Sequence, residues 1–259
     1  MTEWNAGLYR EVSTLQQAMA AEVLEALNVN GSERVLDVGC GDGRITSEIA
    51  RRVPLGSVVG VDASSNMIEL ASGKAGPNLR FEVADARHLP FDREFGLVVS
   101  FNALHWVQEQ ALALRSIHKA LKPGEVAHLR LVPMGARKSI ETVLEETRNA
   151  PAWKEYFNGF RDPYLRLTPE EYCALAQESG FKLERVQTEL KTWDFGSREA
   201  FVDFSSVTMV AWTNRVSQSL RSRFITDVLD RYQTVAAEKP EEENTFKFYQ
   251  MTIVLRSLA

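Results

Sequence analysis

Residues 35–43 read Val-Leu-Asp-Val-Gly-Cys-Gly-Asp-Gly, and an acid, Asp62, closes the next apolar run. A short apolar run with β-branched residues that leads straight into glycines is typical of a buried strand and a tight turn. Helical spacing resumes over 44–53, and residues 58–61 form the second apolar run. Strand, glycine turn, helix, strand and acid predict the nucleoside-binding half of a doubly wound sheet, with the Asp62 carboxylate placed to bind ribose hydroxyls.

The spacing of the glycines decides which nucleoside is expected. A dinucleotide-binding fingerprint, G-x-G-x-x-G, would need glycine where this chain has Arg44. The glycines stand instead at Gly39, Gly41 and Gly43, and Asp37 precedes them. A carboxylate there would repel a pyrophosphate at the helix N-terminus, whereas it suits a positively charged amino-acid group. A nicotinamide dehydrogenase is therefore disfavoured.

This acid-and-glycine pattern, followed by an acid after the second strand, resembles the first two motifs of the class I S-adenosylmethionine (SAM) methyltransferases. The resemblance implies an α/β fold: a doubly wound, seven-stranded, mostly parallel sheet with a helical lid. It also implies SAM as cofactor. The cofactor-binding positions expected on this basis are Asp37, Gly39, Cys40, Gly41, Gly43, Asp62, Ala63, Met67, Asp85, Ala86, Phe101 and Asn102.

Three later segments follow in the order that the family implies. A strand over 79–84 ends before Asp85, which by resemblance bonds the adenine amino group. A strand over 95–100 leads into Asn-Ala-Leu-His-Trp at 102–106, the loop that many family members place beside the methionine part of SAM and the acceptor. A turn at 121–124 precedes a fifth strand over 125–132. His105 and Trp106 are therefore the expected residues beside the methyl group.

The first residues form a separate signal. Trp4-Asn5, with Tyr9 shortly after, resembles the start of the small-molecule group that includes trans-aconitate methyltransferases. By resemblance this segment is a flap over the cofactor, and Tyr9 contacts SAM and positions the acceptor. The alternative is that the aromatic residues only pin the terminus onto the domain. An amphipathic helix is expected over 13–29.

The whole chain is expected to form one methyltransferase domain. Its parts are a flap and helix over 1–30, a SAM-binding core over 31–133, helical additions and a lid around a sixth strand over 134–240, and a final edge strand over 245–257. Further predicted elements are helical structure over 139–180 with a break at 159–163, a strand over 182–191, and two helices over 198–212 and 214–237. We expect the last two helices to cover the carboxyl ends of the strands, where such sheets bind ligands.

No motif in the lid names an acceptor. Aromatic and apolar side chains there could line an acceptor pocket or simply pack the lid onto the sheet: Phe195, Phe201, Phe204, Met209 and Trp212. Arginines offer a bidentate fork for carboxylates. The candidate anion clamps are Arg137, Arg161, Arg166 and Arg198.

Composition limits the classes of binding partner that we expect for this chain. The net charge of the 259 residues is −5, which argues against a surface built to bind nucleic acid. Two cysteines give neither a disulfide framework nor a metal pattern, so no metal is expected. The N-terminus does not read as a leader, and no apolar stretch approaches a membrane span. We expect a cytoplasmic monomer or homodimer that acts on a small molecule.

The function expected from these patterns is SAM-dependent methyl transfer, with a carboxylate oxygen as the leading acceptor. A carboxylate needs no base, whereas a hydroxyl or an acidic carbon would need one, and His105 would supply it. The alternatives are the carboxyl of an acyl-carrier-bound intermediate, a C-methyltransferase of the quinone type, and a SAM-binding protein without transferase activity.

Overall fold

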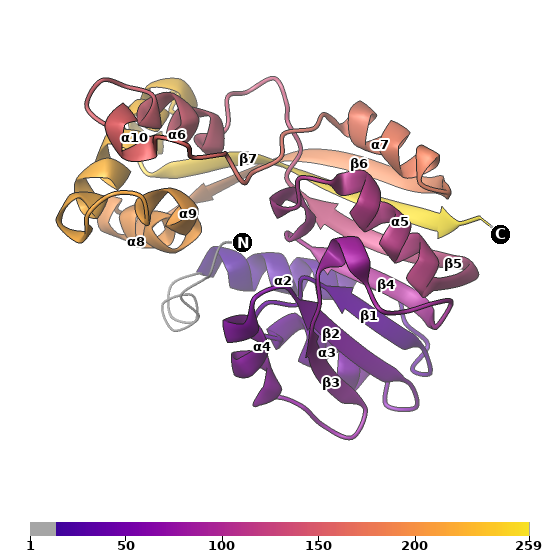
Figure 1. Ribbon diagram of the computed structural model, residues 1–259. Coiled ribbons are helices and arrows are strands. Elements are labelled where there is room, and N and C mark those ends of the chain that lie inside the picture. The colour runs from indigo at the N-terminus through magenta and orange to yellow at the C-terminus, as the bar shows by residue number, and fades with distance from the viewer. Residues whose placement is uncertain (1–13, 259) are drawn as a thin grey trace.

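A computed structural model of the chain describes residues 14–258, and in this part seven strands form one sheet in the order β3-β2-β1-β4-β5-β7-β6 (Figure 1). The strands are β1 (Arg34–Val38), β2 (Ser57–Asp62), β3 (Leu79–Val83), β4 (Phe95–Phe101), β5 (Leu121–Leu131), β6 (Phe181–Asp194) and β7 (Thr245–Ser257). The first five pair in parallel, and β7 is antiparallel to both of its neighbours. The doubly wound, mostly parallel sheet predicted from the sequence is confirmed.

Helices cover both faces of the sheet: α2 (Thr14–Ala26), α3 (Arg44–Arg52), α4 (Ser65–Ser72), α5 (Gln110–Ala120) and α7 (Pro169–Glu178). Four further helices lie apart from these: α6 (Ile140–Arg148), α8 (Arg198–Thr208), α9 (Val210–Thr213) and α10 (Arg221–Ala236). Short 3-10 turns lie at 86–88, 104–106, 154–157, 218–220 and 240–242.

The alternation of side chains along β1 explains the two layers. Val35 packs against α2 and α3 on one face, where Leu24 and Ile49 are also buried. Leu36 and Val38 point to the other face and pack in the cluster that contains residues of α5 and α7. Because successive side chains of a strand point to opposite faces, a strand covered on both sides reads as one continuous apolar run.

The final strand is not at the edge of the sheet, so the predicted edge strand over 245–257 is wrong in position, although its bounds are those of β7. β7 lies between β5 and β6, and β6 forms the edge. The sequences of β6 and β7 fit an edge strand and an internal strand, respectively. Most side chains of β7 are buried, whereas β6 exposes most of its residues, including charged ones, and charged side chains protect an open edge.

The ladder between β6 and β7 continues beyond the end of β5. β5 ends at Leu131, which pairs with Met251, whereas β6 and β7 stay paired up to Asp194 and Thr245. This two-stranded extension leads into α8, α9 and α10, which gather with α6 on one side of Figure 1. We call these four helices and the segment 149–168 the lid. Its core is an apolar cluster separate from the two that flank the sheet.

Several predicted helices are shorter than expected. The break in 139–180 extends over 149–168, because Pro151 and Pro163 cannot donate backbone hydrogen bonds there. The helix expected over 198–212 is interrupted at Met209, which separates α8 from α9. The helix expected from 214 begins at Arg221, after a turn in which the serine hydroxyls at 217 and 219 bond to each other.

Candidate functional site

The glycine turn after β1 has a backbone that only glycine adopts easily. Gly39, Gly41 and Gly43 have φ angles of 78°, 54° and 75°, all in the left-handed region. The backbone N–H groups of Gly39 and Cys40 both donate to the Val61 carbonyl, at 2.8 and 3.0 Å. The turn is therefore fixed onto the end of β2.

The three glycines of the turn differ in the space around them. Two are packed against other side chains, whereas the third faces outward. A Cβ at Gly39 would lie 2.2 Å from the Cβ of Ala103, and one at Gly43 would lie 2.6 Å from the Phe81 ring. A Cβ at Gly41 would meet no atom of residues 14–258 within 4 Å. Gly41 thus presents bare backbone on the open side of the turn, as close approach of a ligand to the main chain requires.

Asp37, on β1 beneath the turn, is a buried carboxylate. It is 2% exposed and accepts a hydrogen bond of 2.7 Å from the Thr46 hydroxyl. Burial raises its pKa to about 7, and the nearby Asp62 carboxylate adds to the rise, although the Thr46 bond lowers it. This carboxylate gains from a positive charge placed beside it, because that charge would offset the burial.

Asp62 ends β2 and organises the start of α4. One carboxylate oxygen accepts from the Gly41 N–H at 3.0 Å, and the other accepts from the Ser64 N–H at 2.9 Å. Ser64 caps α4 by accepting from the N–H of Met67, whose own side chain is buried. Ala63 lies half-buried between them. Each carboxylate oxygen can accept more than one hydrogen bond, and a ribose diol at Asp62 would share these oxygens with the backbone donors.

Asp85 is already bonded to a neighbouring guanidinium. Arg87 donates to both carboxylate oxygens, with Nη2 at 2.6 Å from Oδ2, and also bonds to Glu109 at 2.9 Å. The Arg87 bonds hold the pKa of Asp85 below its ordinary value. An adenine amino group at Asp85 would have to share these oxygens with Arg87. Ala86 packs against the core beside them.

The loop after β4 begins with a strained residue. Asn102 has a φ of 56°, and its side-chain oxygen accepts from Gln250 at 3.1 Å. Gln250 also donates to the Leu131 carbonyl at 2.8 Å, so β7 holds the loop. Phe101, just before it, is buried and lies edge-on to His128.

His105 follows in this loop and is not suited to act as a base. It is 6% exposed, and burial lowers its pKa to about 3. Its Nδ1 accepts a hydrogen bond of 3.3 Å from the Val132 N–H, so the single proton of the neutral ring sits on Nε2. The sequence suggested His105 as a possible base because an ordinary histidine has a pKa near neutrality. Its burial in the structure argues against this role.

Trp106 joins the loop to the lid. Its ring contacts Tyr164 edge-on at 5.2 Å between centroids and Trp212 at 6.1 Å. Tyr164 also lies 4.9 Å from the His105 ring, and the Leu165 N–H donates to the His105 carbonyl at 2.9 Å. The sequence reasoning missed Tyr164, because the segment around it has no helical or strand periodicity that would have singled it out.

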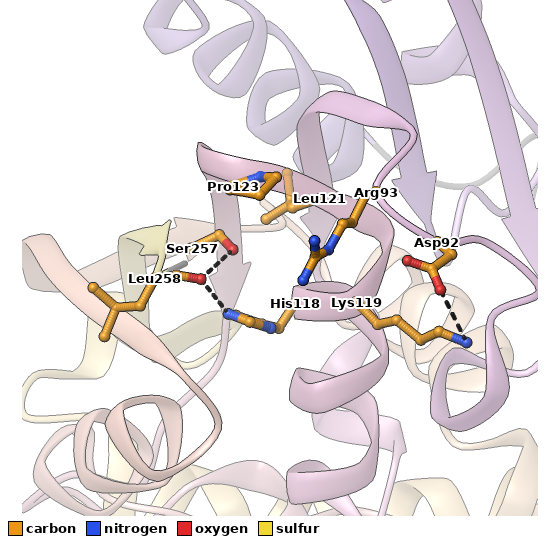
Figure 2. A pocket seen from close by; sticks show the side chains of 8 residues that line it. All are labelled: Asp92, Arg93, His118, Lys119, Leu121, Pro123, Ser257 and Leu258. Carbon is orange, nitrogen blue, oxygen red and sulfur yellow. Dashed lines mark hydrogen bonds and ion pairs between the residues drawn. The ribbon is translucent and has the colours of Figure 1, made fainter.

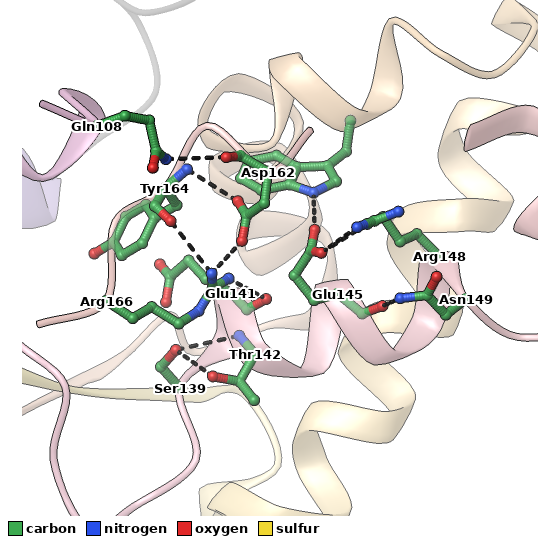
Figure 3. Close-up of polar contacts among 11 residues, drawn as sticks. Gln108, Ser139, Glu141, Thr142, Glu145, Arg148, Asn149, Asp162, Tyr164 and Arg166 are labelled. Carbon is green, nitrogen blue, oxygen red and sulfur yellow. Dashed lines mark hydrogen bonds and ion pairs between the residues drawn. The ribbon is translucent and has the colours of Figure 1, made fainter. Parts of the chain in front are cut away.

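Tyr164 lies at one edge of a group of polar and charged side chains (Figure 3). Arg166 forms an ion pair with Asp162 and donates to the backbone carbonyls of Tyr164 and Glu141. Gln108, from the loop after β4, donates to the Asp162 carbonyl at 3.0 Å. The lid segment 162–166 is thus bonded to the loop that carries His105 and Trp106.

The other lid candidates mostly form the lid core. Phe201, Phe204, Met209 and Trp212 are buried in the lid cluster, and Phe195 stacks on Phe201 at 4.8 Å. Of the two interpretations offered by the sequence, packing of the lid therefore fits these side chains better than lining of an acceptor pocket. Of these five residues, Trp212 is the one whose ring contacts Trp106.

Three of the four arginines considered as anion clamps already have acidic partners. Arg137 is paired with Glu238 and Arg198 with Asp230, in addition to the Arg166 pair. Arg161 is exposed. Tyr9 and the proposed flap over 1–13 lie outside the described residues.

A cavity of about 240 Å³ lies at the opposite end of the sheet (Figure 2). Leu121, at the start of β5, lines it together with Ser257 and Leu258 at the end of β7. His118 Nε2 lies 3.1 Å from the Leu258 carbonyl oxygen within it. Since ligands of doubly wound sheets bind at the carboxyl ends of the parallel strands, this cavity is not part of the candidate site.

Comparison with known families agrees with this geometry. A family model described as a methyltransferase domain matches residues 35–124, which include the glycine turn, Asp62, Asp85 and the loop after β4. Among the described residues, no helix is long and apolar enough to cross a membrane.

Relatives and solved structures extend the likeness to nearly the whole chain. The trans-aconitate 2-methyltransferase of Enterobacter sp. (strain 638) is 28% identical over 250 residues, 94% of this chain and 93% of the relative. That of Deinococcus radiodurans is 26% identical over 259 residues, 97% of each chain. Phosphoethanolamine N-methyltransferase 2 of Haemonchus contortus, solved with S-adenosyl-L-methionine, shares the fold with a TM-score of 0.59 at 18% identity, over 94% of this chain and 53% of that one. The protein described here is a SAM-dependent methyltransferase of the class I fold, similar to the trans-aconitate methyltransferases.

Proposed function

We propose that the enzyme transfers the methyl group to a carboxylate oxygen of a small-molecule acceptor. The observation that carries this proposal is the state of His105: it is neutral, its Nδ1 is occupied, and its pKa is about 3. The loop beside the methyl group therefore lacks the expected base. A carboxylate is ionised at neutral pH and attacks without one. The trans-aconitate 2-methyltransferases of Enterobacter and Deinococcus described above support a small acid as acceptor.

In this proposal SAM, when bound, supplies a methyl group on a positively charged sulfur. Asp37 lies where it can face the ammonium group of the methionine part, and Asp62 can accept hydrogen bonds from the ribose hydroxyls. The bare backbone at Gly41 leaves room for the cofactor between these two carboxylates. Their mutual repulsion, which contributes to the raised pKa of Asp37, is offset by the positive charges of the cofactor.

The remaining cofactor contacts are proposed from position. Asp85 and Ala86 follow β3, whereas Phe101 and Asn102 end β4. In the proposal the first pair lies on the adenine side of the carboxyl edge and the second pair on the methionine side. His105 and Trp106 lie next along the same loop, where they exclude water and position the acceptor. Such positioning is the main contribution that a protein makes to an in-line displacement.

A labelled methyl group distinguishes the acceptor chemistry. The enzyme is incubated with methyl-labelled SAM and a panel of small acids or a metabolite extract, and the products are treated with mild base. A methyl ester releases the label as volatile methanol, which is the expected result. Label that stays fixed to the product would mean an ether, amine or carbon acceptor and would overturn the proposal.

Transfer to a hydroxyl or an acidic carbon is the second candidate, and one observation favours it. Burial raises the pKa of Glu141, which places a carboxyl of increased basicity near Tyr164. If Glu141 were the base, Glu141→Gln would abolish transfer and remove a pH dependence of kcat. With a carboxylate acceptor, Glu141→Gln retains most of kcat.

A further inference from the structure

The charged residues of the lid in Figure 3 contain no arginine that is free to bind an anion. Arg148 pairs with Glu145 at 2.6 Å, and Arg166 pairs with Asp162. Glu141 is the acid left over, so this group has one more acid than base. Its net charge is negative when all its members are ionised.

Tyr164 is the polar side chain that the lid presents to His105 and Trp106. It is 5% exposed, and its hydroxyl has no hydrogen-bond partner among the described residues. A buried hydroxyl without a partner is rare in a native fold and indicates a group that is missing from its surroundings. Burial raises the pKa of Tyr164 well above its ordinary value, so the hydroxyl remains a donor at neutral pH.

The surroundings of this hydroxyl distinguish between acceptors of different charge. Besides burial, the nearby Glu141 carboxylate raises the pKa of Tyr164. Arg166 has the opposite charge, but it lies 5.6 Å from the ring centroid and is held by Asp162. Arg215, which follows α9, is exposed and bonds to the Asn158 carbonyl. One neutral donor can hold one carboxylate, but an acceptor with several carboxylates would meet the uncompensated acid.

Resting on the proposed carboxylate chemistry, we propose that the acceptor is a small acid with a single carboxylate on an apolar body, and that the Tyr164 hydroxyl binds this carboxylate. The rings of Trp106 and Tyr164 would contact the apolar body. One carboxylate oxygen accepts from Tyr164, and the other forms the new bond to the methyl carbon. The carbon–sulfur bond breaks and its electron pair stays on sulfur. A neutral ester and a neutral thioether result, without proton transfer.

The test compares acids of different charge on the full-length enzyme. The acids are trans-aconitate with three carboxylates, glutarate with two, and monomethyl glutarate and hydrocinnamate with one each. We expect kcat/KM for at least one monoacid to exceed that for trans-aconitate and glutarate by tenfold or more. A preference for trans-aconitate or glutarate, with ester products, would overturn this inference and leave the proposed function intact. Base-stable products would overturn both.

Tyr164→Phe then tests the named residue. The substitution removes only the buried hydroxyl without a partner, so the variant should fold and melt at or above the wild-type temperature. We expect KM for the best monoacid to rise at least fivefold and KM for SAM to stay unchanged. The control is Tyr156→Phe, since Tyr156 is 42% exposed in the same lid. Equal KM values for the acid in Tyr164→Phe and wild type would refute the role of Tyr164.

Discussion

The buried carboxylate of Asp37 should make cofactor binding depend on pH. Its pKa is about 7 in the protein without cofactor, compared with an ordinary value of 3.8. A protonated Asp37 cannot pair with the ammonium group of the ligand. At pH 6 roughly a tenth of the molecules carry the ionised form, so affinity for S-adenosylhomocysteine should be about tenfold lower than at pH 8.

The same carboxylate should affect the stability of the protein without cofactor in the opposite sense. Because the pKa is raised on folding, the folded state holds a proton that the unfolded state has lost between about pH 3.8 and 7. Stability is therefore greatest below this range and falls as pH rises through it. The difference between the two pKa values corresponds to about 4 kcal/mol at about 1.4 kcal/mol per unit.

Asp37→Asn separates these two effects. The amide is neutral at every pH, so at pH 8 the variant should melt at a higher temperature than wild type and bind S-adenosylhomocysteine more weakly. Its affinity should not change between pH 6 and 8. Calorimetric titration and thermal melting at both pH values measure these quantities. Asp42→Asn, in the same turn, is the control and should keep the wild-type pH dependence. A wild-type affinity that is equal at pH 6 and 8 would refute the reasoning.

Other parts of the site give separate predictions. Gly39→Ala should destabilise the protein by more than Gly41→Ala, because only the former forces a Cβ against Ala103. Gly41→Ala should lower the free energy of unfolding by about 1–2 kcal/mol through left-handed backbone strain, and it should weaken cofactor binding. Melting and titration distinguish the two. His105→Gln should leave the pH profile of kcat/KM unchanged near pH 6.5, and the loss of a titration there would instead identify the imidazole as a base. Thr168→Ala removes a capping box and should cost about 0.5–2 kcal/mol in denaturant unfolding, with KM unchanged; an altered KM would mean that α7 contributes to the site.

Local patterns predicted the first strands and the glycine turn between them well, because each of these features is encoded within a few residues. The apolar run before Gly39 reads as a buried strand, and the acid at 62 follows the next one directly. The capped start of α7 at Thr168 was equally readable, since the Thr-Pro-Glu-Glu sequence contains both partners of its capping box.

Features that depend on distant contacts could not be predicted in this way. The place of β7 between β5 and β6 is set by pairing between segments far apart in sequence, which no local period encodes. The position of Tyr164 beside His105 depends on a non-periodic segment crossing the loop after β4. The low pKa of His105 follows from burial in the assembled fold, whereas the residue type alone suggests a titration near neutrality.

The extended hairpin of β6 and β7 has a consequence for how such enzymes can diversify. Asp194 and Thr245 are paired across the ladder, so the intervening segment begins and ends at neighbouring points. A replacement segment of another length would meet the same two attachment points, and the closure cost changes only slowly with length. Residues 195–244 therefore form a cassette that could be exchanged between homologues, changing the side chain that packs on Trp106 at the place of Trp212, while the glycine turn and its carboxylates stay untouched.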